Sequence, residues 1–202
     1  MRTGPLSKKA QATRETLLKA ALEVMAEKGY AEATIDDIAK RAGVSKGLAY
    51  YHFRNKRAIA EEIIQNGLNE LVERFEGVAQ RCKTGVEALK GMLNEFSDMI
   101  LGNWRFGKFY LSTLLQDGNV WGSSIDSIDS NIISLIKEQF ARGKEEGSIR
   151  KEVDPEFCAV ACVGLVLMSC LRYLGKEDEP TTATREFFTS SIIDFVSNAT
   201  MA

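Results

Sequence analysis

The chain has 202 residues, of which 45% are hydrophobic and 27% charged, the profile of an ordinary globular protein with a substantial core. Its net charge of −2 hides an asymmetry: residues 1–57 carry 12 Lys and Arg against 6 Asp and Glu, and the remainder carries 14 against 22, so balances of +6 and −8 add to −2. A basic N-terminal region followed by an acidic remainder favours a polyanion that binds the N-terminal region. A solvent-exposed charged face without a binding role would give the same difference in net charge.

Three features argue against secretion and membrane insertion. Residues 1–12 are polar and basic, without the apolar stretch of a signal peptide. The longest apolar run, Phe157–Leu171, is shorter than the ~20 residues that span a bilayer. Four cysteines in a chain of this length do not form a disulfide framework. We therefore expect a cytoplasmic protein with no membrane partner.

Apolar residues recur every three or four positions and strand-like alternation is almost absent, which predicts an all-α fold of about nine helices. At the N-terminal end, cap residues delimit four of them. The first helix is expected over Lys8–Lys28 and is ended by Gly29. The second begins at Thr34, which forms a capping box with Asp37, and ends at Gly43. The third is capped by Ser45 and reaches Phe53, and a long fourth is capped by Asn55.

Further helices follow in the C-terminal part. Thr84 with Glu87 opens one that ends at Gly102, an aromatic segment runs from Trp104 to Trp121, and another helix uses Ile125–Phe140. Asp154-Pro155 is an N-cap followed by proline at the first helical position, a strong start for a helix. That helix is apolar on every side and is expected to be buried all round. An amphipathic helix over Thr182–Ser197 comes last.

Residues 34–53 read TIDDIAKRAGVSKGLAYYHF, two short helices joined by a tight turn at Gly43. The outward face of the second helix gathers hydrogen-bond donors and flat aromatic rings with no carboxylate among them. A DNA groove lined by phosphates requires such a surface. The pattern T-x-x-x-I-A-x-x-A-G-V-S-x-G-x-x-Y-x-x-F-x-x-K, embedded in Leu17–Ile64, resembles the TetR (tetracycline-repressor) family.

That resemblance implies a three-helix helix-turn-helix DNA-binding domain over 1–57 and a helical ligand-binding and dimerisation domain over 58–202. It also implies roles for individual residues in double-stranded DNA binding. Hydroxyls at helix starts and side chains along the recognition helix would contact the backbone, Lys46 and the Gly47 backbone would read base edges, and Leu48 would meet a thymine methyl. The DNA-binding residues predicted are Thr34, Ser45, Lys46, Gly47, Leu48, Tyr50, Tyr51, His52 and Lys56. Two competing interpretations are that Tyr50 and Tyr51 are core aromatics and that a lone surface histidine has no special role.

An aromatic-rich zone in the middle of the chain has two readings: core, or the wall of a cavity for an apolar small-molecule effector, which the family's fold implies. The ligand-binding residues predicted are Phe96, Met99, Trp104, Phe109, Tyr110, Thr113, Leu114 and Trp121. Cys158 and Cys162, four residues apart, invite a redox or metal interpretation, but without a basic neighbour they are expected to be core. The last two helices are expected to pair with their symmetry mates as a homodimer.

The prediction is a homodimeric repressor that binds a palindromic operator and is released by the effector, with no cofactor, no metal and no enzymatic activity. The phosphate-loop spacing at 102–108 is treated as coincidence, because Phe109 replaces the required Ser or Thr. An activator or a corepressor-dependent repressor is the alternative within the class. The alternative outside it is a helical small-molecule-binding protein without specific DNA binding.

Overall fold

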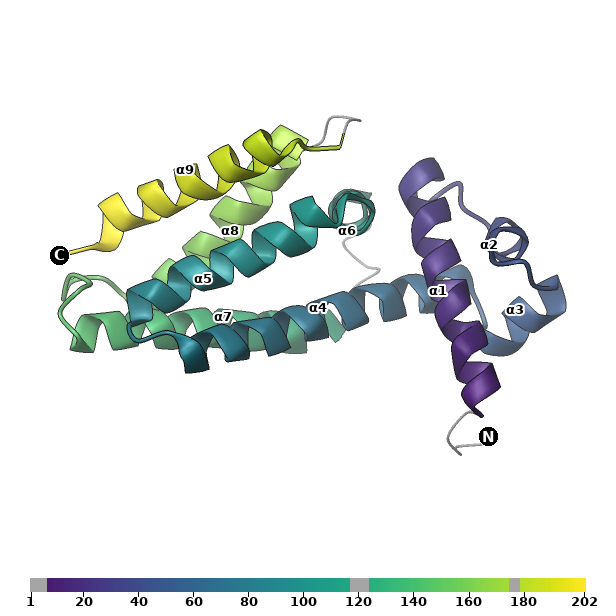
Figure 1. The fold of residues 1–202 in the computed structure, drawn as a ribbon, viewed down its shortest axis with the longest axis horizontal. Helices are drawn as coiled ribbons and strands as arrows, with labels where there is room; N and C mark the ends of the chain where they lie inside the picture. Colours follow the sequence, from purple (N-terminus) through teal and green to yellow (C-terminus); the bar gives the residue numbers. More distant parts are fainter. Residues whose placement is uncertain (1–6, 117–123, 175–178) are drawn as a thin grey trace.

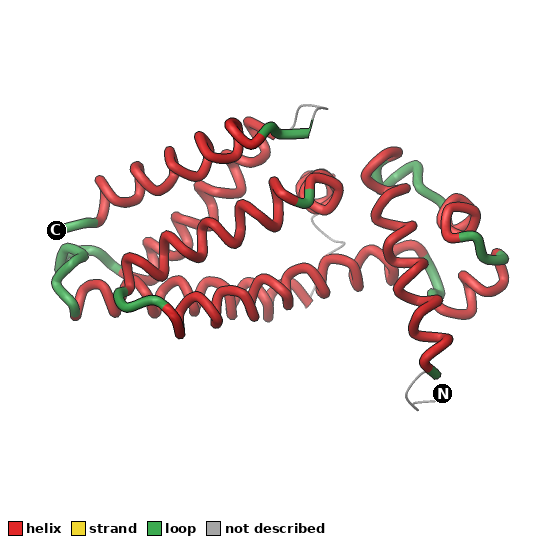
Figure 2. The backbone as a smooth tube through the Cα atoms, viewed as in Figure 1, coloured by secondary structure: helices red, strands yellow, loops and turns green. Residues whose placement is uncertain are grey.

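The computed structural model describes residues 7–116, 124–174 and 179–202, and within these ranges every regular element is a helix (Figure 2). The all-α class expected from the sequence is confirmed. The elements are α1 (Lys8–Lys28), α2 (Ile35–Ala42), α3 (Lys46–His52), α4 (Lys56–Arg81), α5 (Gly85–Ser97), the π-helical turn η1 (Asp98–Gly102), α6 (Trp104–Gln116), α7 (Ser124–Glu145), α8 (Pro155–Leu174) and α9 (Thr182–Thr200).

The helices form two lobes joined by one long helix (Figure 1). Helices α1, α2 and α3 form the N-terminal lobe, and α5 to α9 form the other. Helix α4 packs on α1 in the first lobe and on α5 and α7 in the second. Because α4 is shared, a division of the chain at residue 57 cuts the sequence where the structure is continuous.

Side-chain caps begin α1, α3, α4 and α5: Ser45, Asn55 and Thr84 are caps that the sequence predicted, and Ser7 is one that it did not name. The side chains of Ser7, Ser45, Asn55 and Thr84 each accept a hydrogen bond from the backbone N–H three residues on. These bonds satisfy N–H groups that have no partner inside the helix. The start of every helix in the N-terminal lobe, and of α5, is therefore encoded locally.

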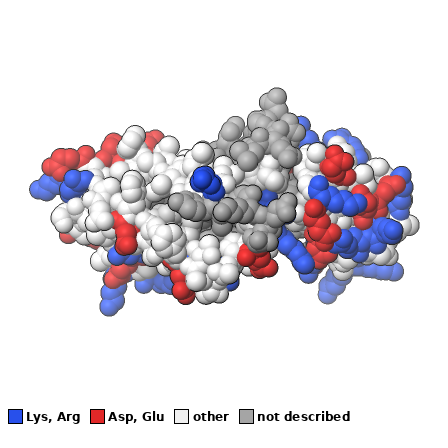
Figure 3. All heavy atoms as spheres, turned by 90° about the horizontal axis from the view of Figure 1, so that it is seen from above, with Lys and Arg blue, Asp and Glu red and all other residues white. Residues whose placement is uncertain are grey.

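Helix α8 is not buried all round within one chain, so the burial expected from its sequence requires a partner. Its outward stripe leaves Phe157 72% and Met168 65% exposed, and on α9 Phe187 and Phe195 are similarly exposed. Residues 155–172 are apolar and long enough to cross a membrane by length and composition alone, although one such helix is weak evidence of a span. Seen from above, charged side chains crowd the two ends of the molecule, and the described surface between them is largely uncharged (Figure 3).

Candidate DNA-binding surface and effector cavity

The turn between α2 and α3 is built on Gly43, whose φ of 68° is left-handed backbone that glycine adopts without strain. The N–H of Val44 donates to the carbonyl of Ala39 and closes the turn. Helix α3 then buries Ala49 and Phe53 and holds its other side chains outward. A short helix of this kind is stable only through such packing.

The outward face of α3 is the surface that the sequence predicted. Ser45, Lys46, Gly47, Leu48, Tyr50 and Tyr51 are all exposed, with Tyr51 75% and Tyr50 47% accessible. The competing interpretation of these two tyrosines as core residues is therefore wrong. His52 is half-buried, and its pKa is lowered by burial and by the charge of Arg14, which favours the neutral ring in the free protein.

Thr34 is exposed at the start of α2, where its hydroxyl is already engaged. It accepts from the backbone N–H of Asp37, whose carboxylate accepts in turn from the Thr34 N–H and hydroxyl. Lys28 lies 2.7 Å from the same carboxylate, and the hydrogen bonds from Lys28 and Thr34 lower the pKa of Asp37 to about 2. The ionised Asp37 carboxylate thus lies at the N-terminus of α2, where the helix dipole stabilises a negative charge.

Lys46, predicted to read base edges, makes an ion pair with Asp36 at 2.7 Å. The sequence pattern of α3 showed no carboxylate on this surface, but the fold brings one from α2. Both side chains are more than half exposed, so the pair contributes little to stability. Its effect on an approaching phosphate backbone is larger, because Asp36 both repels the DNA and occupies the Lys46 ammonium.

We therefore expect Asp36→Asn to tighten DNA binding several-fold, and to do so more strongly at low salt. Fluorescence anisotropy with a labelled fragment at several salt concentrations measures this. Glu61→Gln, which removes an exposed carboxylate on α4 that pairs with Arg57, is the matched control. Unchanged or weaker DNA binding by Asp36→Asn would contradict the placement of Lys46 at the DNA.

Lys56 points into the lobe rather than away from it. Its ammonium donates to the carbonyls of Tyr30 and Ala31, at 2.6 and 2.8 Å, and lies 4.6 Å from the centre of the Tyr30 ring. It therefore anchors the start of α4 to the segment after α1. These two hydrogen bonds leave the third N–H of the ammonium for the predicted phosphate contact.

Arg14 on α1 holds the end of the recognition helix, and the sequence analysis did not single it out. Its guanidinium forms a two-point ion pair with Glu62 on α4 and donates to the carbonyl of His52 at 2.9 Å. It also lies 4.2 Å from the centre of the Phe53 ring. One side chain thus fixes α1, α3 and α4 relative to one another. Its partners lie 38 to 48 residues away in sequence, so no local pattern marks it.

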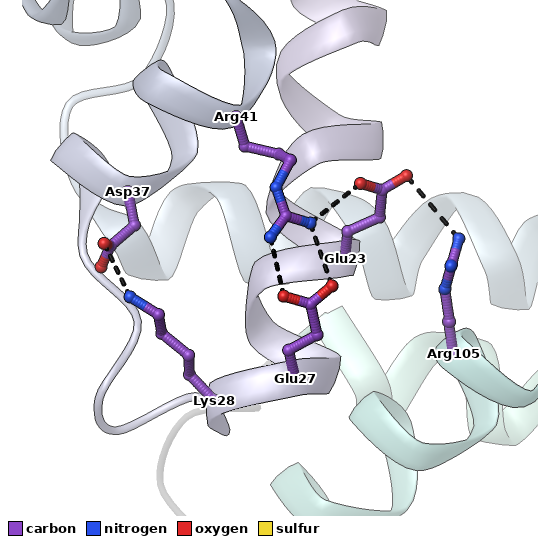
Figure 4. Close-up of polar contacts among 6 residues, drawn as sticks. All are labelled: Glu23, Glu27, Lys28, Asp37, Arg41 and Arg105. Carbon is purple, nitrogen blue, oxygen red and sulfur yellow. Dashed lines mark hydrogen bonds and ion pairs between the residues drawn. The ribbon is translucent and has the colours of Figure 1, made fainter.

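A second ionic network joins the two lobes (Figure 4). Arg41 on α2 binds both carboxylate oxygens of Glu27 and one of Glu23, both on α1. The other oxygen of Glu23 lies 3.7 Å from Arg105 on α6. These groups are exposed, so each pair is weak by itself. The network nevertheless gives α6 a direct contact with the helices that carry the DNA-binding surface.

Two small apolar cavities adjoin inside the C-terminal lobe. One, of about 80 Å³, lies among α5, α7, α8 and α9, and the other, of about 70 Å³, among α4, α5, α6, α7 and α8. Both are lined by Met92, Leu93, Cys162 and Val166, so these four side chains separate them. An engineered apolar cavity of about 150 Å³ binds benzene. A ligand of benzene size or larger therefore needs more room than either cavity gives.

The predicted ligand residues divide between cavity wall and core. Phe96 and Tyr110 line the second cavity. Four others are buried and line neither cavity: Met99, Trp104, Phe109 and Thr113. The Leu114 side chain and Trp121 lie outside the part that the structure describes. None of the predicted ligand residues lies on α8 or α9, although α8 lines both cavities and α9 lines the first.

The cysteine thiols of α8 fit the core interpretation better than a redox one. Burial raises the pKa of Cys162 to about 11 and that of Cys170 to about 12, and it also raises the pKa of Cys158. These thiols therefore stay protonated at neutral pH, and a protonated thiol is a poor nucleophile. Cys162 takes part in the cavity as a small apolar side chain.

A helix-turn-helix presented at one end of a helical body with apolar cavities defines a DNA-binding transcriptional regulator with a separate effector domain. Residues 17–63 match the family model described as bacterial regulatory proteins, tetR family. Over these residues the chain carries the DNA-binding region of a TetR-family regulator.

Individual relatives and structures are similar to this chain over different lengths. The fatty acid metabolism regulator protein of Bacillus subtilis (strain 168) is 25% identical over 138 residues, which cover 68% of this chain and 71% of that protein. The repressor KstR2 of Mycolicibacterium smegmatis is 32% identical over 79 residues, and there the match spans only 38% of the relative. The fold is similar to that of the fatty acid degradation regulator FadR from Bacillus halodurans, with a TM-score of 0.83 and 20% identity over 98% of this chain and 97% of that one.

Proposed function

We propose that this protein is a cytoplasmic, non-enzymatic repressor that binds a pseudo-palindromic operator as a homodimer and is released by a small, largely apolar effector. The observation that carries the proposal is the outward face of α3, where two exposed tyrosines and Lys46 stand on a helix fixed by Arg14. In a dimer, two such helices reach successive major grooves about 34 Å apart. The predicted DNA contacts and the effector both belong to this proposal.

The apolar stripe on α8 and α9 supports the homodimer. Phe157, Val160 and Met168 share one face of α8 and are all more than half exposed in a single chain. Gly164, on the same stripe, has open space where a side chain would stand, so a second helix can approach closely. Pairing these helices about a two-fold axis covers the stripe with its own copy.

Contacts between α6 and α4 supply the coupling that release requires. Tyr110, in the wall of the second cavity, stacks on Phe106 with the rings 5.9 Å apart. The Phe106 ring lies against Gly67 at the middle of α4, where a Cβ atom would come within 2.3 Å of it. A ligand that moves Tyr110 therefore moves the helix that leads into the DNA-binding lobe. Couplings of this kind are typically 1–3 kcal/mol.

Replacing Tyr51 with Ala tests the DNA-binding surface. Because Tyr51 is exposed and its ring contacts only His52 among the aromatic rings described, we expect unchanged stability and dimerisation but about tenfold weaker binding to DNA fragments that the wild-type protein selects. Tyr51→Phe separates the contribution of the ring from that of the hydroxyl. Equal affinity of Tyr51→Ala and wild type would place the DNA contact elsewhere.

A further inference from the structure

A polar groove of about 510 Å³ lies between the end of α5 and the beginning of α9. Ile193 lines both this groove and the apolar cavity of about 80 Å³. The groove and the cavity therefore lie end to end along the contact between α5 and α9, here called the seam. In Figure 1, α9 runs alongside α5 over this region. The seam is therefore apolar toward the end of α9 and polar toward its beginning.

Arg185, on the α9 side of the groove, has no ion-pair partner among the residues that the structure describes. Its Nε is buried and has no hydrogen bond within that part of the chain. The floor beside it is fixed: Ser97 and Thr189 are buried and hydrogen-bonded at 2.7 Å, and the Thr189 hydroxyl also donates to the Arg185 carbonyl. A buried guanidinium donor without a hydrogen bond lowers the stability of the free protein. A ligand acceptor that forms this hydrogen bond removes that penalty and is therefore bound tightly.

The charges around the groove restrict what that acceptor can be. The planar fork of arginine matches a carboxylate or a phosphate. Asp98 and Glu186 also line the groove, and both are exposed. One cation against two carboxylates disfavours a head with several negative charges, but it allows a single carboxylate that reaches Arg185 directly.

Resting on the proposed regulatory function, we propose that the effector is an amphiphile with one carboxylate and an apolar chain, its carboxylate held by Arg185 and its chain in the cavity between α5 and α9. The stripe of α9 that carries Phe187 and Phe195 faces away from the groove, so dimerisation through it leaves the groove open. The head then lies beside η1, which leads directly into α6; that helix packs on α1 and places the Phe106 ring against Gly67 of α4.

The test is calorimetric titration of the full-length dimer with dodecanoate, dodecan-1-ol and dodecanoyl-coenzyme A. We expect dodecanoate to bind at least tenfold more tightly than the alcohol and than the coenzyme A ester. Arg185→Gln should reduce dodecanoate binding to the level of the alcohol and leave alcohol binding within about twofold. Because it removes an unpaired donor, this variant should unfold at the same temperature as wild type or a higher one.

Lys90→Gln is the control variant, because Lys90 is the cation that lines the apolar cavity. If Lys90→Gln lost the preference for dodecanoate over the alcohol and Arg185→Gln kept it, the assignment to Arg185 would be overturned. Unchanged dodecanoate binding by Arg185→Gln, or coenzyme A ester binding as tight as dodecanoate, would also overturn it. Arg185-dependent binding of dodecanoate without DNA release would uphold this site and contradict the proposed function. DNA release by another compound, unaffected by Arg185→Gln, would contradict this site and uphold the proposed function.

Discussion

Replacing Met168 with Glu is expected to split the dimer into folded monomers. Met168 is 65% exposed in a single chain, so the substitution leaves the core of the protomer untouched. Near a two-fold axis, however, the new carboxylate faces its own copy and both are buried without a partner. Uncompensated buried charges cost several kcal/mol, which raises the dimer dissociation constant about 100-fold or more.

Sedimentation velocity at micromolar concentration measures this change, with circular dichroism as the check on folding. Met168→Gln is the matched control, because it is similar in size and polar but uncharged, and its effect should be much smaller. Loss of the dimer should also weaken operator binding, since one half-site alone is held by one recognition helix. A Met168→Glu protein that sediments as the wild-type dimer would show that α8 does not form the interface.

Replacing Arg14 with Ala is expected to disorganise the recognition helix without touching a residue that faces the DNA. The change leaves the half-buried Glu62 carboxylate without its partner and the His52 carbonyl without its donor. Hydrogen bonds to charged groups contribute roughly 1.5–3 kcal/mol each, so we expect a loss of about 2–3 kcal/mol in the free energy of unfolding. DNA affinity should fall at least tenfold, because the end of α3 loses its anchor.

Urea unfolding and DNA-binding anisotropy measure the two effects of Arg14→Ala. Arg74→Ala is the control: Arg74 also pairs with glutamates on its own and a neighbouring helix, but in the C-terminal lobe. That variant should lose about 1 kcal/mol at most and bind DNA normally. If Arg14→Ala bound DNA with wild-type affinity, the recognition helix would be positioned by apolar packing alone.

The sequence predicted the elements of this fold well because their signals are local. The first helix ends where Gly29 caps it, and Gly43 and Ser45 define the turn before the recognition helix. The fifth helix differs: it was expected to continue to Gly102, but it ends at Ser97 and a π-helical turn follows. That turn brings Gly107 against the carbonyl of Ile100, a tertiary contact that leaves no periodic signal.

The candidate sites were less predictable because their charges are paired across the fold. Asp36 meets Lys46 from another helix, and Lys56 donates hydrogen bonds to the carbonyls of Tyr30 and Ala31 after α1. Arg185 gave no signal in the sequence, since an unpaired cation is defined only by what surrounds it. Residue types at fixed spacing predicted which side chains of α3 are exposed, while the partners of individual side chains required the structure.

Selection of genomic fragments by the purified protein, followed by sequencing of the bound DNA, tests the central claim most directly. The account predicts one enriched pseudo-palindrome whose half-sites are centred about one helical turn apart, or a small multiple of it, as two recognition helices of a symmetric dimer require. Binding to it should weaken when the effector is present. Fragments without a shared sequence, in the absence and in the presence of cell extract, would contradict the account and indicate a small-molecule-binding protein without specific DNA binding.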